Sequence, residues 1–565
     1  KNLAEQFGIA ANIDFLPPGS FINQQLEAWL PVDLPLLTPD ILRWRLFALL
    51  QNQELMQEKV FLALSRFMQS GDTQLRAWQL AGELTQAYEK YQAWRKHWLL
   101  DWHHYLDESD WQAKLWFLAS TGYCFRAQAF QRYFKLFETT NINKPAKLPE
   151  RLFVFACQSV SPDVLRVLRS LARWSQVHFY LHNPCLAYWG DVQNPKTAEQ
   201  LIAIQGDNAL LNQWGFAGRD FVAGLISEQG QYDKADQAIY KAPQNEMPSL
   251  LHQIQTDILY RKQPDVAFPE FSTKLQDDSL QIHNCHTPLR EVQVLRAQLL
   301  ALFEKYPELN ARDVAIMTPH LDRYATYFEA VFNQQDGIYT PLPYSLSDQT
   351  LFAESTLAKL FFRLLSIANS RFTSNQGFEL IAHAHIAKHY GLVKNDLQRI
   401  HYWLQQASIR WGIDCEHRQS IDGVAQQQFT WQQGIQRLLL GYVSNQSQQL
   451  DGIAPVLTPI GQDQDLLDTL IDFTAIINTT QKKLNQKMNV AQWQSTLTGL
   501  LQKFSVLDEL QDNDLETYYR LNEKINQLSQ LAVNSPANFE YSLSMISDYL
   551  NDEGEQRLSQ AWLSG

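Results

Sequence analysis

Residues 151–185 read RLFVFACQSVSPDVLRVLRSLARWSQVHFYLHNPC, and this stretch decides the fold. A β-branched and aromatic run, an amphipathic run and a second β-branched and aromatic run predict a strand, a helix and a strand. Ser161 stands where its hydroxyl can cap the helix, and Pro162 stands where no amide donor is needed. The buried face of the helix is predicted from four apolar residues at helical spacing: Val164, Leu165, Leu168 and Leu171.

A second stretch, residues 280–319, repeats this order as LQIHNCHTPLREVQVLRAQLLALFEKYPELNARDVAIMTP. It predicts a strand, a helix of about five turns and a Val/Ile strand. Short apolar strands that alternate with amphipathic helices favour parallel pairing through right-handed crossovers. The chain is therefore expected to be an α/β protein, and two ordinary α/β domains with any function remain an alternative, because fold does not fix function.

The rest of the sequence carries mostly helical patterns, and its 565 residues exceed what one hydrophobic core organises. A helical region over residues 1–148 precedes an α/β part over 149–277, which ends in a polar, linker-like stretch. A second α/β part over 278–370 is followed by a helical region over 371–565. Two α/β parts, each with a large all-α insertion, are typical of a two-lobed helicase core.

The cysteines and the hydropathy indicate the compartment. Five cysteines, an odd number without a C-x-x-C pair, are spread over the chain: Cys124, Cys157, Cys185, Cys285 and Cys415. A disulfide framework or a structural zinc site is not expected, and a reducing, cytoplasmic location fits. No apolar run is long enough to cross a bilayer, so no membrane partner is expected. The chain begins with Lys inside a helical pattern, and we expect it to be a fragment that lacks both ends.

The net charge of −13 argues against nucleic acid, but the charge is uneven. Residues 41–170 carry 17 Lys and Arg against 12 Asp and Glu, together with seven of the 16 tryptophans. Cations interleaved with aromatic rings suit single-stranded DNA, because cations track the backbone and rings stack on bases. Tryptophan on a helix is nevertheless usually core.

Within residues 77–99 the helical spacing separates core residues from candidate ligand contacts. The predicted core residues fall on one side: Leu80, Leu84, Tyr88, Tyr91 and Trp98. The polar and basic neighbours Gln86, Lys90 and Arg95 are the better candidates for touching a ligand.

Catalytic motifs are sparse. The sequence has no G-x-x-x-x-G-K-[ST] phosphate loop and no G-x-S-x-G elbow, and no set of carboxylates is spaced to hold magnesium. His385 and His389 share a helix face and could bind zinc, but a solvated helix face is favoured. His283, Cys285 and His286 could be ligands or a nucleophile pair, but packing in a buried strand is favoured. We expect no catalytic site, no metal and no cofactor in this chain.

Seven phrases occur in an order that carries a specific resemblance. They are FGIAANIDF (7–15), HNPCLAYWGD (182–191), NALLNQWGFAGRDF (208–221), HTPLREVQVL (286–295), PLPYSLSD (341–348), RWGID (410–414) and TWQQGIQRLLLGY (430–442). Together they closely resemble the RecC family, the gamma subunit of bacterial exodeoxyribonuclease V, the RecBCD complex. The resemblance spans essentially the whole chain. It implies that the family's first strand and loop precede Lys1 and that its later helicase-like and nuclease-like parts follow Gly565.

The resemblance implies an α/β, mostly helical fold with superfamily 1 helicase-like lobes that have lost their ATP site. It implies a DNA repair and recombination subunit that holds two motor subunits of the RecB and RecD type in a heterotrimer. Such subunits help to divide duplex DNA and read the recombination hotspot Chi in a single strand. ATP and Mg²⁺ are then expected on the partner subunits, which supply hydrolysis and cleavage.

The Chi-reading positions carry over in part. Arg95 in WRKHW and Arg126 in FRAQAFQRY match arginines that the family places along its strand tunnel, where they can contact phosphates or base edges. Gln86 and Glu89 stand where the family has aspartates. Pro17 and Asn23 stand where it has Leu and Trp, which leaves the recognised sequence open. The alternative role of Arg95 is a helix-end salt bridge.

Two other classes of function stay open. One is a helicase-nuclease subunit of the AddB type, whose cleavage site would lie in the missing C-terminal half. An Asp, Glu and Lys nuclease set or iron–sulfur cysteines beyond Gly565 would favour that class. The other is a purely structural interaction protein without DNA contact.

Overall fold

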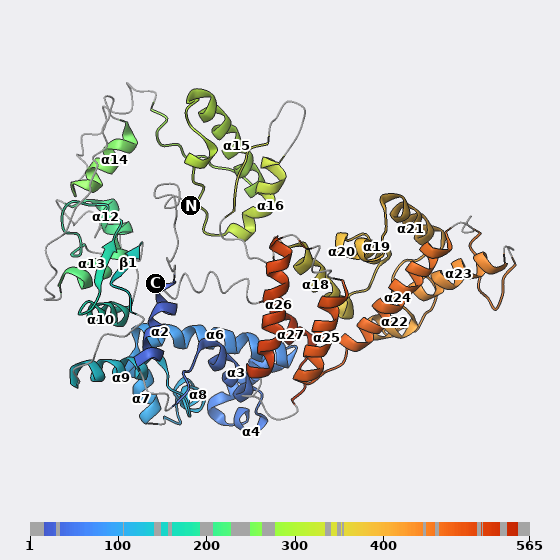
Figure 1. Cartoon of the computed structure of the whole chain (residues 1–565), viewed down its shortest axis with the longest axis horizontal. Helices are drawn as coiled ribbons and strands as arrows, with labels where there is room; N and C mark the ends of the chain where they lie inside the picture. The colour runs from blue at the N-terminus through green and yellow to red at the C-terminus, as the bar shows by residue number, and fades with distance from the viewer. Residues whose placement is uncertain are drawn as a thin grey trace.

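The computed structural model describes most of the chain, and Figure 1 shows its arrangement. The described residues are 16–29, 34–105, 107–139, 148–155, 161–192, 207–227, 249–262, 277–333, 341–346, 352, 355–444, 448–457, 463–504, 510, 512–531 and 539–551. Over these residues the protein is mostly helical, with one two-stranded parallel sheet.

The first predicted strand-helix-strand unit is confirmed. Strand β1 (Arg151–Phe155) pairs in parallel with β2 (Gln176–Tyr180), and α10 (Pro162–Leu171) connects them. Pro162 lies in the first turn of α10, and the four predicted apolar residues of its face are buried. The predicted cap is wrong, because the buried hydroxyl of Ser161 makes no capping hydrogen bond.

The second predicted unit is confirmed only in its helix. Helix α15 (Pro288–Lys305) begins where Thr287 accepts a hydrogen bond from the amide of Arg290, at 3.2 Å. The flanking residues 280–286 and 314–318 form no strand. A strand needs a neighbour for its amides and carbonyls, and neither segment has one among the described residues. Ile282 and Met317 are accordingly 91% and 90% exposed.

The described residues between 16 and 139 are mainly helical. Their helices are α2 (Pro18–Trp29), α3 (Pro39–Leu50), α4 (Gln53–Met56), α5 (Leu62–Gln69), α6 (Thr73–Trp94), α7 (Lys96–His104), α8 (Trp111–Ser120) and α9 (Arg126–Thr139). Polar side chains cap the starts of α3 and α6. The hydroxyl of Thr38 accepts a hydrogen bond from the amide of Ile41, and the carboxylate of Asp72 accepts from the amides of Gln74 and Leu75.

The remaining helices lie between the sheet and the end of the described chain. They are α12 (Ala209–Trp214), α13 (Phe216–Ser227), α14 (Leu250–Leu259), α16 (Leu321–Phe332), α18 (Thr356–Ser366), α19 (Ser374–Ile381), α20 (Ala384–His389), α21 (Lys394–Gln406), α22 (Cys415–Asp422), α23 (Trp431–Ser444), α24 (Gln464–Leu484), α25 (Val490–Lys503), α26 (Asp512–Leu531) and α27 (Leu543–Asn551). Most of them lie in the region that the sequence predicts to be helical.

The largest core joins the two ends of the sequence. Figure 1 shows α3 and α6 beside α26 and α27, and residues of all four helices share one buried cluster. Trp44 lies 4.9 Å from Trp78 between ring centroids, and 5.7 Å from both Tyr541 and Tyr549. A fragment ending near residue 370 would therefore expose this core.

A buried carboxylate joins α26 to the start of α18. Asp514 accepts hydrogen bonds from the hydroxyl of Ser355 at 2.6 Å and from the amide of Leu357 at 3.1 Å. Its other oxygen accepts from Thr356 at 2.5 Å and lies 3.1 Å from Nε2 of His385 on α20. These bonds hold the pKa of the Asp514 carboxyl below its ordinary value even though burial opposes this, so the N-terminus of α18 is held by an ionised partner.

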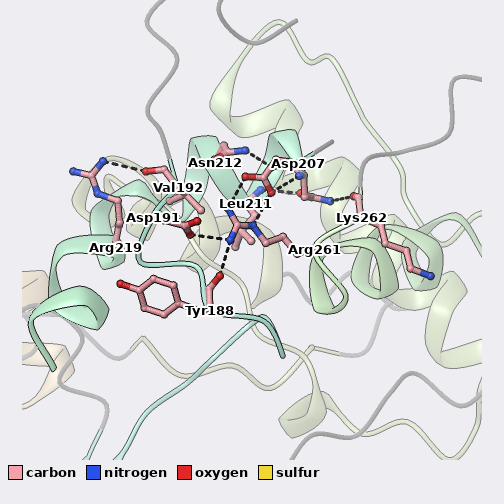
Figure 2. A network of polar contacts seen from close by, with 10 residues as sticks. Tyr188, Asp191, Val192, Asp207, Leu211, Asn212, Arg219, Arg261 and Lys262 are labelled. Carbon is pink, nitrogen blue, oxygen red and sulfur yellow. Dashed lines mark hydrogen bonds and ion pairs between the residues drawn. The ribbon is translucent and has the colours of Figure 1, made fainter. Parts of the chain in front are cut away.

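Figure 2 shows a polar network that ties the loop before α12 to the end of α14. Arg261 adopts a left-handed backbone conformation with φ of 52° and directs its guanidinium at Asp207 through two hydrogen bonds of 2.7 Å. The same side chain donates to Asp191 at 2.8 Å and to the carbonyl of Tyr188 at 2.6 Å. The bonds from Arg261 lower the pKa of Asp207.

We expect Arg261→Met to loosen this network. Charge-assisted hydrogen bonds contribute roughly 1.5–3 kcal/mol, and the variant leaves the poorly exposed Asp207 without its partner. Amide hydrogen exchange over residues 183–192 and 207–214 should therefore accelerate. Because folding lowers the pKa of Asp207, the effect should be full above the ordinary carboxyl pKa of about 3.9 and fade as the pH falls below it.

The matched control is Lys305→Met, since Lys305 pairs with Asp278 at 2.8 Å but both side chains are about half exposed. Such surface pairs contribute about 0–1 kcal/mol, so this variant should exchange like the wild type. Equal exchange in both variants would show that the Arg261 network is not what holds the segment.

Candidate nucleic-acid interface at the junction of α6 and α7

Helix α6 presents one face to the core and the other to solvent. Its inward residues, among them Trp78, Leu84 and Tyr88, are buried. The hydroxyl of Tyr88 donates a hydrogen bond to the carbonyl of Gln112 at 2.9 Å. The outward residues are exposed and follow one another at helical spacing: Gln79, Glu83, Gln86, Lys90 and Trp94. The polar residues predicted to face a ligand thus lie on the accessible side of the helix.

Arg95 ends α6 and turns the chain into α7. Its φ of −133° and ψ of 33° break the helix, so it is both the last cap of α6 and the first cap of α7. Helix α7 is then fixed from two sides. Lys96 pairs at 2.6 Å with the buried Asp163 at the start of α10, and the indole of Trp116 donates to the carbonyl of Leu99 at 3.1 Å.

The break changes which aromatic residues belong to the core. Leu84 and Tyr88 are buried as predicted, and Leu80 and Tyr91 are half-buried. The core prediction for Trp98 is wrong, because it is 38% exposed. The 3.6-residue period on which that prediction relied stops at Arg95, so Trp98 no longer continues the buried stripe.

Three rings support one another under this surface. The Trp98 centroid lies 5.5 Å from that of Tyr91 and 6.1 Å from that of Trp102. These edge and tilted contacts fix the plane of the Trp98 ring while part of it remains accessible. The ring is therefore oriented before any ligand arrives.

The Arg95 guanidinium is available at this surface. Its carbon lies 5.2 Å from the Trp98 ring centroid, a cation–π contact, and the side chain is exposed. Within the part of the chain that the structure describes, no acidic partner of Arg95 is recorded, so the helix-end salt bridge that the sequence allowed is not formed there. Lys90 and His97 are exposed close by in the sequence.

Glu89 and Arg126 lie behind the exposed face. Glu89 is buried, and one of its oxygens accepts from Nε2 of Gln92 at 2.6 Å. Burial raises the pKa of Glu89 to about 7, and the nearby positive charge of Arg126 opposes that rise. Arg126 is the first residue of α9, is partly exposed, and has its guanidinium 5.4 Å from the Phe130 ring centroid.

The four residues that the sequence assigned to DNA binding thus lie in two separate places. Gln86 and Arg95 are exposed on the outward side of α6 and its end, whereas Glu89 and Arg126 interact on the side toward α9. The predictions missed Trp94, which is 53% exposed at the last position of α6. Its spacing of four from Lys90 and eight from Gln86 was the available signal. Pro17 and Asn23, which differ from the family's Leu and Trp, both lie in the short described segment 16–29 that contains α2.

The histidine candidates take other roles. His385 lies against Asp514, and His389 packs at 5.6 Å from the Phe504 ring. The predicted buried strand around His283, Cys285 and His286 is wrong, since this segment is largely exposed and forms no strand. In the described segments no cluster of three or more His, Cys, Asp or Glu side chains could hold a metal ion.

Two further observations concern the whole described chain. The four cysteines it contains, Cys124, Cys185, Cys285 and Cys415, are free thiols. None of its helices combines the length and the hydropathy that a membrane span requires.

Comparison with known families gives two matches. The family model described as "RecC, N-terminal domain" matches residues 1–261, and the model described as "RecBCD enzyme subunit RecC fourth domain" matches residues 354–558. The first of these regions contains all of the α6–α7 surface, and together the two regions take in most of the chain.

Similar curated proteins carry the same family name. The RecBCD enzyme subunit RecC of Escherichia coli K12 is 28% identical over the whole of this chain, and that of Haemophilus influenzae is 26% identical over 97% of it. The RecC of Mycolicibacterium smegmatis is 26% identical over 90% of the chain. The chain spans about half the length of these relatives, 54%, 54% and 48% respectively.

We expect Glu89→Gln to stabilise the protein increasingly as the pH rises. Folding raises the pKa of Glu89 to about 7, so ionising the buried carboxyl opposes folding, on the order of 1–3 kcal/mol, once the pH exceeds its unfolded value near 4.3. The melting temperature of the variant relative to the wild type should therefore climb between about pH 4 and pH 7. Glu83→Gln, an exposed position on the same helix, should give a flat difference. A flat profile for Glu89→Gln would contradict a buried, protonated carboxyl.

Proposed function

Because this chain belongs to the RecC family, we propose that it is the non-motor subunit of an ATP-dependent helicase and exonuclease complex of the RecBCD type. In this role it holds the two motor subunits, guides the separated DNA strands and recognises Chi in single-stranded DNA. The complex serves double-strand-break repair and recombination in the cytoplasm. In this proposal the β1–α10–β2 unit belongs to the first of two helicase-like lobes, and α15 belongs to the second.

The observation that carries the DNA-binding part of this proposal is the exposed guanidinium of Arg95. It stands at the position that the resemblance assigns to the Chi strand, beside two partly exposed tryptophans and without an acidic partner in the described residues. A cation that is not neutralised by the protein is free to pair with phosphate or with a base edge. Arg126 is the second cation, and its positive charge is near enough to the buried Glu89 to oppose the rise in the pKa of that carboxyl.

The catalytic work belongs to the partners in this proposal. ATP and Mg²⁺ bind the RecB-type and RecD-type subunits, and this chain contributes strand guidance and sequence sensing. The AddB-type alternative is not favoured, because both matching family models describe RecC domains. A purely structural role without DNA contact is the alternative that experiment must exclude.

We expect Arg95→Ala and Arg126→Ala, tested in the complete complex, to weaken the response to Chi and leave unwinding largely intact. Each variant removes one of the two cations that the resemblance assigns to the Chi strand, and a contact to a base edge contributes about 1–3 kcal/mol of discrimination. The measurements are Chi-dependent product formation and the unwinding rate on the same duplex.

The matched control is Arg520→Ala, because Arg520 is an exposed arginine on α26 that pairs with Glu516 at 2.9 Å. It should change neither readout. If Arg95→Ala and Arg126→Ala lowered unwinding and Chi response equally, the two arginines would have a structural role instead of a sensing one.

We expect the intact chain, without partners, to bind a labelled single-stranded oligonucleotide at low salt. Its logarithmic affinity should fall linearly with the logarithm of salt concentration, with a slope of about −0.7 for each phosphate neutralised. The whole chain is needed, because α3 and α6 share their core with α26 and α27. Absence of binding at low salt would favour the purely structural role.

A further inference from the structure

Trp94 is an exposed tryptophan in an ordered place. It is the last residue of α6 and is 53% exposed. The next residue, Arg95, joins α6 to α7, and these two helices pack against each other. No ring contact or hydrogen bond of the Trp94 side chain is recorded within the described residues. Single exposed apolar side chains are common on protein surfaces, so what Trp94 binds has to be judged from the residues around it.

The surroundings of Trp94 indicate the chemistry of that ligand. Lys90 lies one helical turn before it on the same face, and Arg95 follows it directly. Trp98, held by Tyr91 and Trp102, presents a second partly accessible ring under the Arg95 guanidinium. An apolar protein partner would meet two cations here, whereas a single nucleic-acid strand carries both phosphates for the cations and flat bases for the rings.

The nearest exposed carboxylates in the sequence flank this surface and do not lie within it. Glu83 lies three turns before the end of α6, and Asp101 lies on α7 beyond Trp98. Between them the sequence from Lys90 to Trp98 holds Lys90, Arg95 and Lys96 and no exposed acid. Lys96 is engaged with Asp163, so the cations left for a ligand in this stretch are Lys90 and Arg95.

We propose that the indole of Trp94 stacks on a base of the bound single strand, with Trp98 as a second stacking ring and Lys90 and Arg95 on the neighbouring phosphates. This rests on the proposed function, which supplies the strand. Stacking on a ring is tolerant of base identity, because every base has a π-face. Trp94 therefore holds the strand in register, and selection of the sequence falls to the polar side chains beside it.

The test measures binding of labelled (dT)20 to the intact chain without partners. Trp94→Leu removes the flat ring and keeps an apolar side chain, so the affinity should fall about 5- to 150-fold, the equivalent of one base stack. Trp94→Phe keeps a ring and should recover most of the affinity. Trp214→Leu is the control, since Trp214 at the end of α12 is 71% exposed and outside this surface.

Salt dependence separates stacking from charge. Trp94→Leu should leave the slope of logarithmic affinity against logarithmic salt unchanged, because no cation is lost. Arg95→Gln should make that slope shallower by about 0.7, the contribution of one phosphate contact on a single strand. Photo-cross-linking of a strand that carries 5-iodouracil should give an adduct in the peptide that contains Trp94.

The outcomes are distinct. Wild-type binding together with unchanged affinity in Trp94→Leu, or an adduct confined to other peptides, overturns the stacking role and leaves the proposed function standing. A loss of affinity that Trp94→Phe fails to restore also overturns it, because the ring would not be the required feature. Absence of any salt-dependent binding by the wild type overturns the proposed function itself.

Discussion

The burial of α6 between helices from opposite ends of the sequence is the constraint on which the rest of the structure depends. Trp78 on α6 and Trp44 on α3 are buried. The ring of Tyr549 on α27 packs against both of them, and the ring of Tyr541, just before α27, packs against Trp44. Large aromatic side chains contribute most of the apolar area in such a core. Once this face is fixed, the rotation of α6 about its axis is fixed too, and so is the set of residues that faces solvent.

The packing of the buried face also fixes the orientation of the outward face of α6. Gln86, Lys90 and Trp94 lie opposite the buried stripe, so none of them can turn inward without unpacking Trp78. The break at Arg95 sends α7 back toward α8 and α10, where the pairing of Lys96 with Asp163 holds it. A surface built in this way needs little rearrangement to bind a strand, which lowers the entropy lost on binding.

The sequence predicts local elements well and long-range partners poorly. The β1–α10–β2 unit and the start of α15 follow from apolar spacing, proline position and a capping threonine, all of which act within a few residues. The strands expected on either side of α15 fail because a strand is defined by its neighbour, and the sequence around Ile282 and Met317 does not specify one. The joining of α6 to α27 was equally hidden, because the contacting residues lie more than 450 positions apart.

The candidate site shows the same division. The exposure of Gln86 and Lys90 follows from the helical period, which is local information. Arg95 is exposed where the helix ends. The period also led to a buried Trp98, because it carries no signal for the helix break at Arg95. Trp94 lies before that break, on the face of Gln86 and Lys90, so the same period could have placed it among the exposed residues. Glu89 shows why a motif match alone is insufficient: the resemblance assigns its position to the Chi strand, but its carboxyl is buried and accepts a hydrogen bond from Gln92. Burial raises the pKa of this carboxyl to about 7, so it is largely neutral in mildly acidic solution, unlike the exposed aspartate that the motif match suggests.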